Sequence, residues 1–133
     1  IHLGLFAGGR RRQTEALIEA VLDSAPPGAP VIIAGDFNDW GNHLSEALRS
    51  RLGVTEVFDE RTPSVGMGSF LRRLRGPNAK IQPARTFPAM LPFLQLDRIY
   101  VRGFSIESAE VLKGALWARL SDHAPILATL QLK

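Results

Sequence analysis

The chain has 133 residues, of which 45% are hydrophobic, and it carries a formal net charge of +3 at pH 7. A domain of this size buries roughly 68–70% of its unfolded surface, so it can fold without a disulfide or a metal ion. The absence of cysteine excludes disulfides, thiolate metal sites and cysteine nucleophiles. No apolar segment approaches the ~20 residues of a transmembrane helix. With no visible signal peptide, we expect a cytoplasmic protein, and the positive charge favours ligands that carry phosphate.

The first part of the chain alternates strand and helix signals. Residues 1–6 predict a strand that is already under way at the first residue, so we expect the chain to be part of a longer protein. A helix is predicted from Arg10 to about Ser24, where Ala and Leu recur at three- to four-residue spacing. Proline and glycine in residues 25–30 end it. Residues 31–34 are a short apolar run, typical of a strand that helices cover on both faces.

Strand signals dominate the rest of the chain. A short helix is expected at residues 44–52. Residues 59–84 contain Gly, Pro, Ser and basic residues and predict one long irregular loop, of a kind that is usually functional or mobile. The remaining strands are predicted at residues 54–58, 85–87, 96–101, 106–112 and 126–132. Together these elements predict a single α/β unit with helices early and strands late.

The first of three polar motifs follows the predicted strand 31–34, at the kind of strand end where α/β folds bind ligands. It contains Asp36 and Asn38, two residues apart. An aspartate can accept a proton from water, and an asparagine amide can donate to a developing oxyanion. Asp and Asn after a strand are also common turn formers, whose side chains bond to their own backbone. The motif alone leaves both interpretations open.

The other two motifs supply an aspartate and a histidine. Asp97 lies in the apolar run 96–101, where a carboxylate is costly to bury without a partner. His123 follows Asp122 just before the last predicted strand. It is a natural partner for Asp97, because a carboxylate behind an imidazole fixes its tautomer and favours its charged form. For either motif alone, a purely structural hydrogen bond is the alternative.

Together the motifs resemble the endonuclease/exonuclease/phosphatase family, which comprises deoxyribonuclease-like metal-dependent phosphoesterases. The resemblance spans essentially the whole chain. It rests on His2-Leu3, Arg10 with Gln13, Gly35-Asp36-Phe37-Asn38, Asp97-Arg98-Ile99 and Ser121-Asp122-His123. It implies an α/β fold that is half of a four-layer α/β sandwich, with a mixed, mostly antiparallel sheet and helices on one face. Residues 1–133 would be the C-terminal half of the family's domain, with the N-terminal half absent.

The resemblance also implies a role for each matching position. Asp36 would orient and deprotonate the attacking water, and Asn38 would hydrogen-bond the phosphoryl oxygen. His123, with Asp97 behind it, would stabilise the charge that builds on the phosphate. His2 would act at the leaving-group or phosphate oxygen.

The implied activity is metal-dependent hydrolysis of phosphodiester or phosphomonoester bonds, of the nuclease or phosphatase type. Asp122 and Asp36 would bind Mg²⁺ or Mn²⁺. The family's principal metal ligand, a glutamate in its N-terminal half, has no counterpart here, so we expect this chain alone to be inactive. One half of the sandwich would expose an apolar sheet face, which we expect self-association or the other half to cover. The alternative function is a non-catalytic module that binds phosphate or nucleic acid on the same fold.

The substrate class stays open at the level of sequence. Nucleic acid, sugar phosphates and phospholipid head groups all carry a suitable phosphoester. The strings Arg85–Pro88 and Leu96–Val101 resemble an uncharacterised bacterial group of the family. A basic cluster in or near the long loop either holds substrate phosphates or forms a solvated surface. Its members are Arg72, Arg73, Arg75, Lys80 and Arg85.

Overall fold

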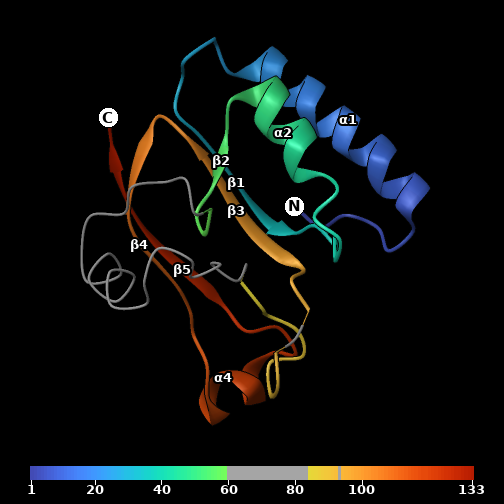
Figure 1. Ribbon diagram of the computed structural model, residues 1–133, viewed down its shortest axis with the longest axis vertical. Coiled ribbons are helices and arrows are strands. Elements are labelled where there is room, and N and C mark those ends of the chain that lie inside the picture. Colours follow the sequence, from blue (N-terminus) through green and yellow to red (C-terminus); the bar gives the residue numbers. More distant parts are fainter. Residues whose placement is uncertain (60–83, 93) are drawn as a thin grey trace, which may run out of the picture.

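The computed structural model describes residues 1–59, 84–92 and 94–133. The predicted long loop at 59–84, apart from its two ends, lies outside the described residues, as do its basic residues other than Arg85. The described elements are α1 (Ala7–Ser24), β1 (Val31–Asp36), α2 (Ser45–Leu52), β2 (Thr55–Glu56), β3 (Asp97–Arg102), β4 (Phe104–Val111), α4 (Ala115–Leu120) and β5 (Ile126–Leu132), as Figure 1 shows.

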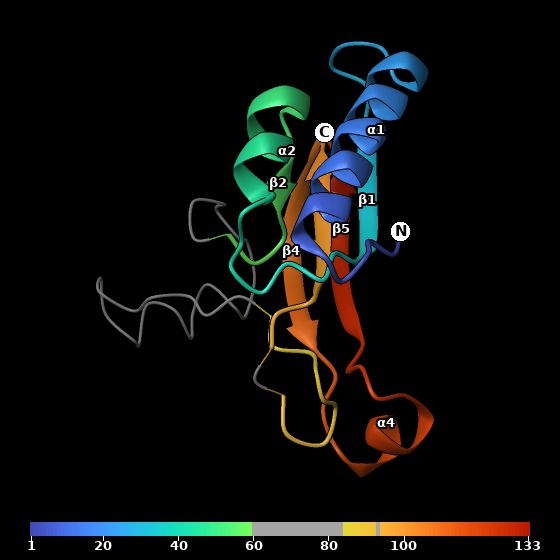
Figure 2. The same cartoon turned by 90° about the vertical axis from the view of Figure 1, so that its right-hand side faces the viewer.

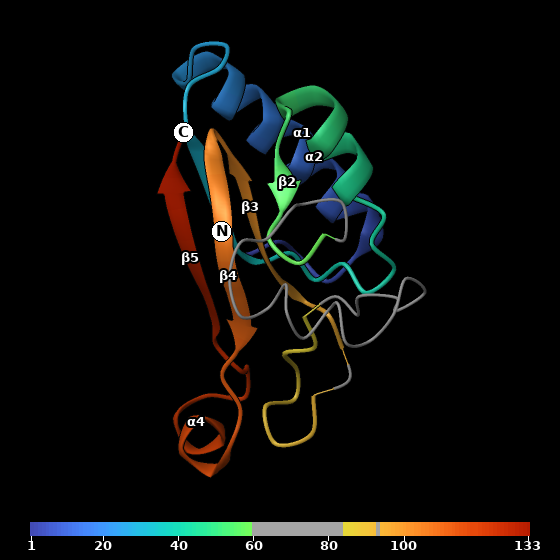
Figure 3. The ribbon, with the colours of Figure 1, turned by 60° about the vertical axis from the view of Figure 1, so that its left-hand side comes forward.

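β3 is the central strand of a three-stranded antiparallel sheet with the order β1-β3-β2. At Gly103 the chain passes from β3 into β4, which pairs with β5 in a separate antiparallel sheet. α1 and α2 lie on one side of the three-stranded sheet, and β4 and β5 lie on the other (Figures 2 and 3). The predicted α/β fold class, with antiparallel strands and helices, is therefore confirmed.

Alternate residues of β3 contribute to two separate cores, because successive side chains of a strand point to opposite faces. Tyr100 packs on the helix side with Ile33 of β1 and Leu48 of α2. Its neighbour Val101 packs on the other side with Ile106 of β4. The β4–β5 pair thus covers β3.

β1 is not covered on both faces, contrary to the prediction. Ile33 is buried against the helices, but its neighbour Ile32 is 53% exposed on the opposite face. The reason is that the β4–β5 pair packs on β3 and leaves β1 open on that side. Leu127 of β5 is exposed as well. Self-association through this apolar face stays a prediction.

The predicted strand at residues 1–6 is reduced to a short parallel bridge between His2 and Asp36. The Leu3 amide donates to the Asp36 carbonyl at 2.8 Å, and the Asp36 amide donates to the Ile1 carbonyl at 3.0 Å. The close approach requires a glycine at position 35, because a Cβ there would lie 1.9 Å from the Ile1 carbonyl oxygen. α1 then begins at Ala7, three residues before the predicted start at Arg10.

Two more predictions differ from the structure. Residues 85–87 form only an isolated bridge, between Phe87 and Leu94, instead of a strand. α4 interrupts the predicted series of late strands, and none of its six residues is buried. In the part of the chain that the structure describes, no helix has the length and apolar character to cross a membrane.

Three charged side chains are buried on the helix side of the sheet. Arg98 is only 1% exposed, and Asp39 and Glu56 are buried with it. Among the described residues, one polar atom of each has no hydrogen-bond partner, namely Asp39 Oδ1, Glu56 Oε1 and Arg98 Nε. Burial raises the pKa of Glu56 to about 7, although the nearby charge of Arg98 lowers it. Glu56 therefore changes its charge near neutral pH.

Replacing Glu56 with Gln is expected to make the free energy of unfolding less dependent on pH. The pKa of Glu56 rises from 4.5 to about 7 on folding, so its ionisation progressively destabilises the folded chain as pH rises through this window. The Gln side chain stays neutral. We expect equal stability near pH 4.5, and a variant that is more stable by about 1–3 kcal/mol at pH 8.

Urea unfolding of both proteins at the two pH values measures this difference. Glu110→Gln, which changes an exposed glutamate of β4, is the matched control. A stability difference for Glu56→Gln that is the same at both pH values would contradict the assignment.

Candidate active site

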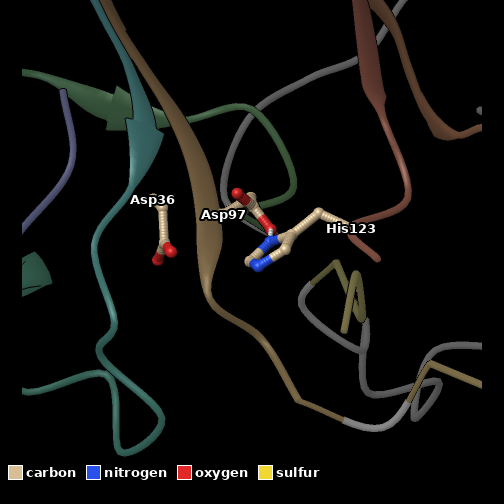
Figure 4. A group of neighbouring side chains, drawn as sticks. All are labelled: Asp36, Asp97 and His123. Carbon is tan, nitrogen blue, oxygen red and sulfur yellow. Dashed lines mark hydrogen bonds and ion pairs between the residues drawn. The ribbon is translucent and has the colours of Figure 1, made fainter. Parts of the chain in front are cut away.

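Three side chains from separate parts of the sequence meet at one end of the three-stranded sheet (Figure 4). Asp36 ends β1, Asp97 begins β3, and His123 lies in the turn between α4 and β5. The register of the sheet places Asp36 directly opposite Asp97. One candidate ligand atom from each of the three residues lies within 4.8 Å of the other two. The structure thus brings together three of the residues that the motifs singled out.

His123 is held by Asp97, as the sequence predicted. Its Nδ1 lies 2.8 Å from Asp97 Oδ2, and its ring packs against Phe87 with a centroid distance of 5.0 Å. With Nδ1–H donating to the carboxylate, Nε2 is the ring nitrogen that remains for a ligand. Partial burial lowers the pKa of His123, but the hydrogen bond and charge of Asp97, with the charges of Asp36 and Asp122, raise it overall. The arrangement favours an imidazolium.

Asp36 has two neighbours in the site. Its Oδ1 accepts a hydrogen bond from the Asn38 backbone amide at 2.8 Å, which is the turn-forming contact that the sequence left open. Its Oδ2 lies 3.6 Å from His2 Nε2, and the side chain of His2 is 77% exposed. The turn-forming contact and a place in the polar cluster therefore coexist at Asp36.

Asn38 is buried, and its side chain has a structural partner. The residue is 4% exposed and adopts a left-handed backbone with φ of 49°. Its amide nitrogen donates to the Leu3 carbonyl at 2.7 Å. An amide has two N–H groups, so the expected role at a phosphoryl oxygen requires the second one. That role stays a prediction.

Asp122 lies beside the cluster and outside it. Its side chain is exposed, and it is not in the group formed by Asp36, Asp97 and His123. Its carbonyl accepts a hydrogen bond from the Ala89 amide at 2.7 Å. The predicted role of Asp122 as a metal ligand is not tested by these contacts.

The donor set at the sheet end fits a hard divalent cation. Mg²⁺ is usually held by one or two carboxylates, and water and substrate phosphate oxygens complete its octahedron. Asp36 and Asp97 supply the carboxylates, and Asp97 is also engaged by His123. The two carboxylates are therefore part of a Mg²⁺ ligand set, in which water, substrate oxygens or further protein groups would take the remaining positions.

Sequence reasoning missed the residues that hold these side chains in place. Asp39, which directly follows Asn38, accepts a hydrogen bond from the Leu44 amide at 2.8 Å and so closes the loop before α2. The Thr86 carbonyl accepts the Ala124 amide at 2.8 Å, which fixes the turn that carries His123. An acidic residue next to the Gly35–Asn38 motif was the available signal for Asp39. Thr86 lies in the string Arg85–Pro88, but nothing in that string indicates that its carbonyl would hold the turn with His123.

Asp97→Asn is expected to lower the pKa of His123, because it keeps a side chain of the same shape and removes its negative charge. The pKa of His123 is raised in the folded chain, so its protonation adds stability at low pH. This contribution is lost as pH rises through that pKa. An NMR titration of the imidazole signals measures the change, with Asp23→Asn, in an exposed part of α1, as the control. An unchanged midpoint would show that Asp97 does not act on His123.

Comparison with known proteins places the chain among curated relatives of similar sequence. The uncharacterized protein YbhP of Escherichia coli (strain K12) is 39% identical over 132 residues, which are 99% of this chain and 45% of YbhP. A UPF0294 protein of Vibrio cholerae (El Tor Inaba N16961) is 25% identical over 132 residues, which are 99% of this chain and 38% of that protein. The chain spans less than half the length of these relatives.

Two solved structures share the fold. A functionally unknown conserved protein from Enterococcus faecalis V583 has a TM-score of 0.72 at 20% identity, over 100% of this chain and 48% of that one. An endonuclease/exonuclease/phosphatase from Bacteroides vulgatus has a TM-score of 0.67 at 21% identity, over 95% of this chain and 45% of that one.

The family model for the Endonuclease/Exonuclease/phosphatase family matches residues 2–123. The matched segment begins at His2 and ends at His123, so it includes every candidate site residue. This match confirms the resemblance that the motifs indicated. The chain belongs to the endonuclease/exonuclease/phosphatase family.

Proposed function

We propose that this chain supplies the carboxylates and the histidine of the active site of a metal-dependent phosphoester hydrolase. The observation that carries the proposal is the meeting of Asp36, Asp97 and His123 at one end of the sheet. Family membership supports a hydrolase of the phosphoesterase or nuclease type. The raised pKa of the His123 imidazole beside these carboxylates supports the proposal, because perturbed pKa values cluster at functional sites.

The geometry suits attack of water on phosphorus. The oxygen of water forms the new bond to phosphorus, the ester P–O bond breaks, and the leaving oxygen takes up a proton. Asp36, half-buried at the end of β1, is placed to orient the water and accept its proton. His123 is placed to donate from Nε2 to a phosphoryl oxygen, because its Nδ1 is committed to Asp97.

Asp36 and Asp97, with Asp122 as the further predicted ligand, would hold the divalent ion. When bound, Mg²⁺ or Mn²⁺ supplies Lewis-acid stabilisation of charge on the phosphoryl oxygens. The two carboxylates at the sheet end give only part of an octahedral ligand set. Because the chain spans less than half the length of its curated relatives, we propose that a further protein ligand comes from residues outside 1–133, in a longer protein of which this chain is a part.

The proposal is tested with bis-p-nitrophenyl phosphate, a generic phosphodiester, and p-nitrophenyl phosphate, a monoester, in the presence of Mg²⁺ or Mn²⁺. The chain is compared with the longer protein to which we propose it belongs. We expect turnover by the longer protein and its loss with a chelator, and no turnover by the chain alone. The ratio of the two rates separates diesterase from phosphatase activity.

Substitutions in the longer protein identify the residues responsible. Asp36→Asn and His123→Ala are each expected to lower kcat by about 10²–10⁴-fold, while Asp23→Asn leaves it unchanged. A folded longer protein without turnover, or full activity in both site variants, would favour the alternative of a non-catalytic module. Retained binding of inorganic phosphate in that case would identify it as a phosphate-binding module.

A further inference from the structure

Arg98 is a buried charged residue to which the proposed chemistry gives no role. It directly follows Asp97 in β3, and strand alternation turns its side chain away from the site and into the helix-side core. Burying a guanidinium is costly unless its charge and N–H groups are satisfied.

The backbone of Arg98 lies opposite Gly35 in the pairing of β3 with β1. Its guanidinium donates to the Asp39 carbonyl at 3.4 Å. Arg98 thus contacts the chain on both sides of the segment Asp36-Phe37-Asn38. The Phe37 amide donates to the Leu96 carbonyl at 2.8 Å. The chain is therefore held at Gly35, Phe37 and Asp39, by contacts with Arg98 and with Leu96, the residue before Asp97.

Two acidic residues, Asp39 and Glu56, are buried on the same side of the sheet as Arg98. Asp39 brings a buried carboxylate whose Oδ2 accepts the Leu44 amide and whose Oδ1 has no partner among the described residues. Glu56 of β2 brings a second buried carboxylate, close enough for the charge of Arg98 to influence its ionisation. Removing the guanidinium would take its charge away from Glu56 and its contact with the Asp39 carbonyl away from the loop that follows Asn38.

We propose that Arg98 is a positioning residue, which holds Asp36 and Asn38 in place from the underside of the sheet so that the Asp36 carboxylate stays beside Asp97 and His123. The proposal rests on the proposed function of that site, but its first test needs no turnover. Arg98 itself is separated from the site by the strand that carries it, so it acts through the loop and not on substrate.

A second arginine of β3 provides a matched control. Arg102 donates from its side chain to the carbonyls of Ala29 at 2.9 Å and Leu52 at 2.8 Å. Like Arg98, it therefore ties backbone carbonyls outside the sheet to β3, but at the opposite end of the strand from Asp97. Arg98→Met and Arg102→Met remove similar side chains, and only the first removes a brace of the candidate site.

Amide hydrogen exchange followed by NMR is the first test. The informative amides are those of Asn38, bonded to Asp36, and Leu44, bonded to Asp39. We expect Arg98→Met to increase the exchange rates of these two amides at least tenfold more than those of the core amides of α1. For Arg102→Met we expect the same change in exchange rate at these two amides as in the core of α1. Equal changes in the two variants, or none in Arg98→Met, would overturn the proposal.

Two further variants keep the test informative if Arg98→Met does not fold. Arg98→Met combined with Glu56→Gln removes a buried charge together with a counter-charge, which is less costly than removing one partner alone. Arg98→Lys keeps the positive charge and is expected to restore much of the slow exchange at Asn38 and Leu44. If the double variant exchanges like the unmodified chain at these two amides, the proposal fails.

In the longer protein, Arg98→Met is expected to lower kcat by at least tenfold with little change in KM, because the substituted side chain does not touch substrate. Arg98→Lys should recover part of kcat, and Arg102→Met should retain it. Absence of turnover in the unmodified longer protein would count against the proposed hydrolase while the exchange result still decides the role of Arg98. Normal kcat in Arg98→Met would overturn the positioning role.

Discussion

The antiparallel pairing of β1 with β3 is the constraint on which the rest of the structure depends. It sets Asp36 opposite Asp97 at one end of the sheet, and it places Arg98 opposite Gly35. A slip of one residue would exchange the faces of the sheet. It would turn Asp97 into the helix-side core and Arg98 towards the site. The buried pair Ile33 and Tyr100 on the helix side, with the two helices that cover them, fixes the register that prevents this.

The two histidines at this end of the sheet, His123 and His2, come from segments outside the three-stranded sheet. His123 arrives on the turn before β5, and that turn is held by backbone hydrogen bonds to Thr86 and Ala89. His2 arrives on the first residues of the chain, which approach β1 closely because position 35 is a glycine. Asp36, Asp97 and His123, with His2 beside Asp36, come from four distant parts of the sequence. Their geometry is therefore a property of the tertiary fold.

Much of this arrangement could be predicted from the sequence, for definite physical reasons. α1 and α2 have apolar residues at helical spacing, and β1 is a short apolar run between turn signals, so their positions were predicted closely. The motifs around Asp36, Asp97 and His123 pointed to a shared site because their chemistry is complementary. α4 was missed because six residues are too few to show a helical period, although its Leu116 and Leu120 are apolar and exposed.

Other features depend on tertiary contacts that leave no local pattern. The destination of the Asn38 amide, the Leu3 carbonyl, is 35 positions away in sequence. The exposure of Ile32 depends on where the β4–β5 pair packs, and the apolar run itself looks like a fully covered strand. In the sequence Arg98 is only part of a motif, because its burial follows from strand alternation beside Asp97 and from the packing of the helix-side core.

The central proposal is that Asp36 and Asp97 hold a divalent cation beside His123. A Mn²⁺ titration followed by NMR tests it most directly. Paramagnetic broadening needs only transient occupancy, so it reports even a weak, partial ligand set. At Mn²⁺ concentrations well below that of the chain, the account predicts that signals of these three residues broaden first, and that Asp36→Asn removes the effect. Broadening that begins elsewhere on the chain and leaves the His123 imidazole sharp would contradict it.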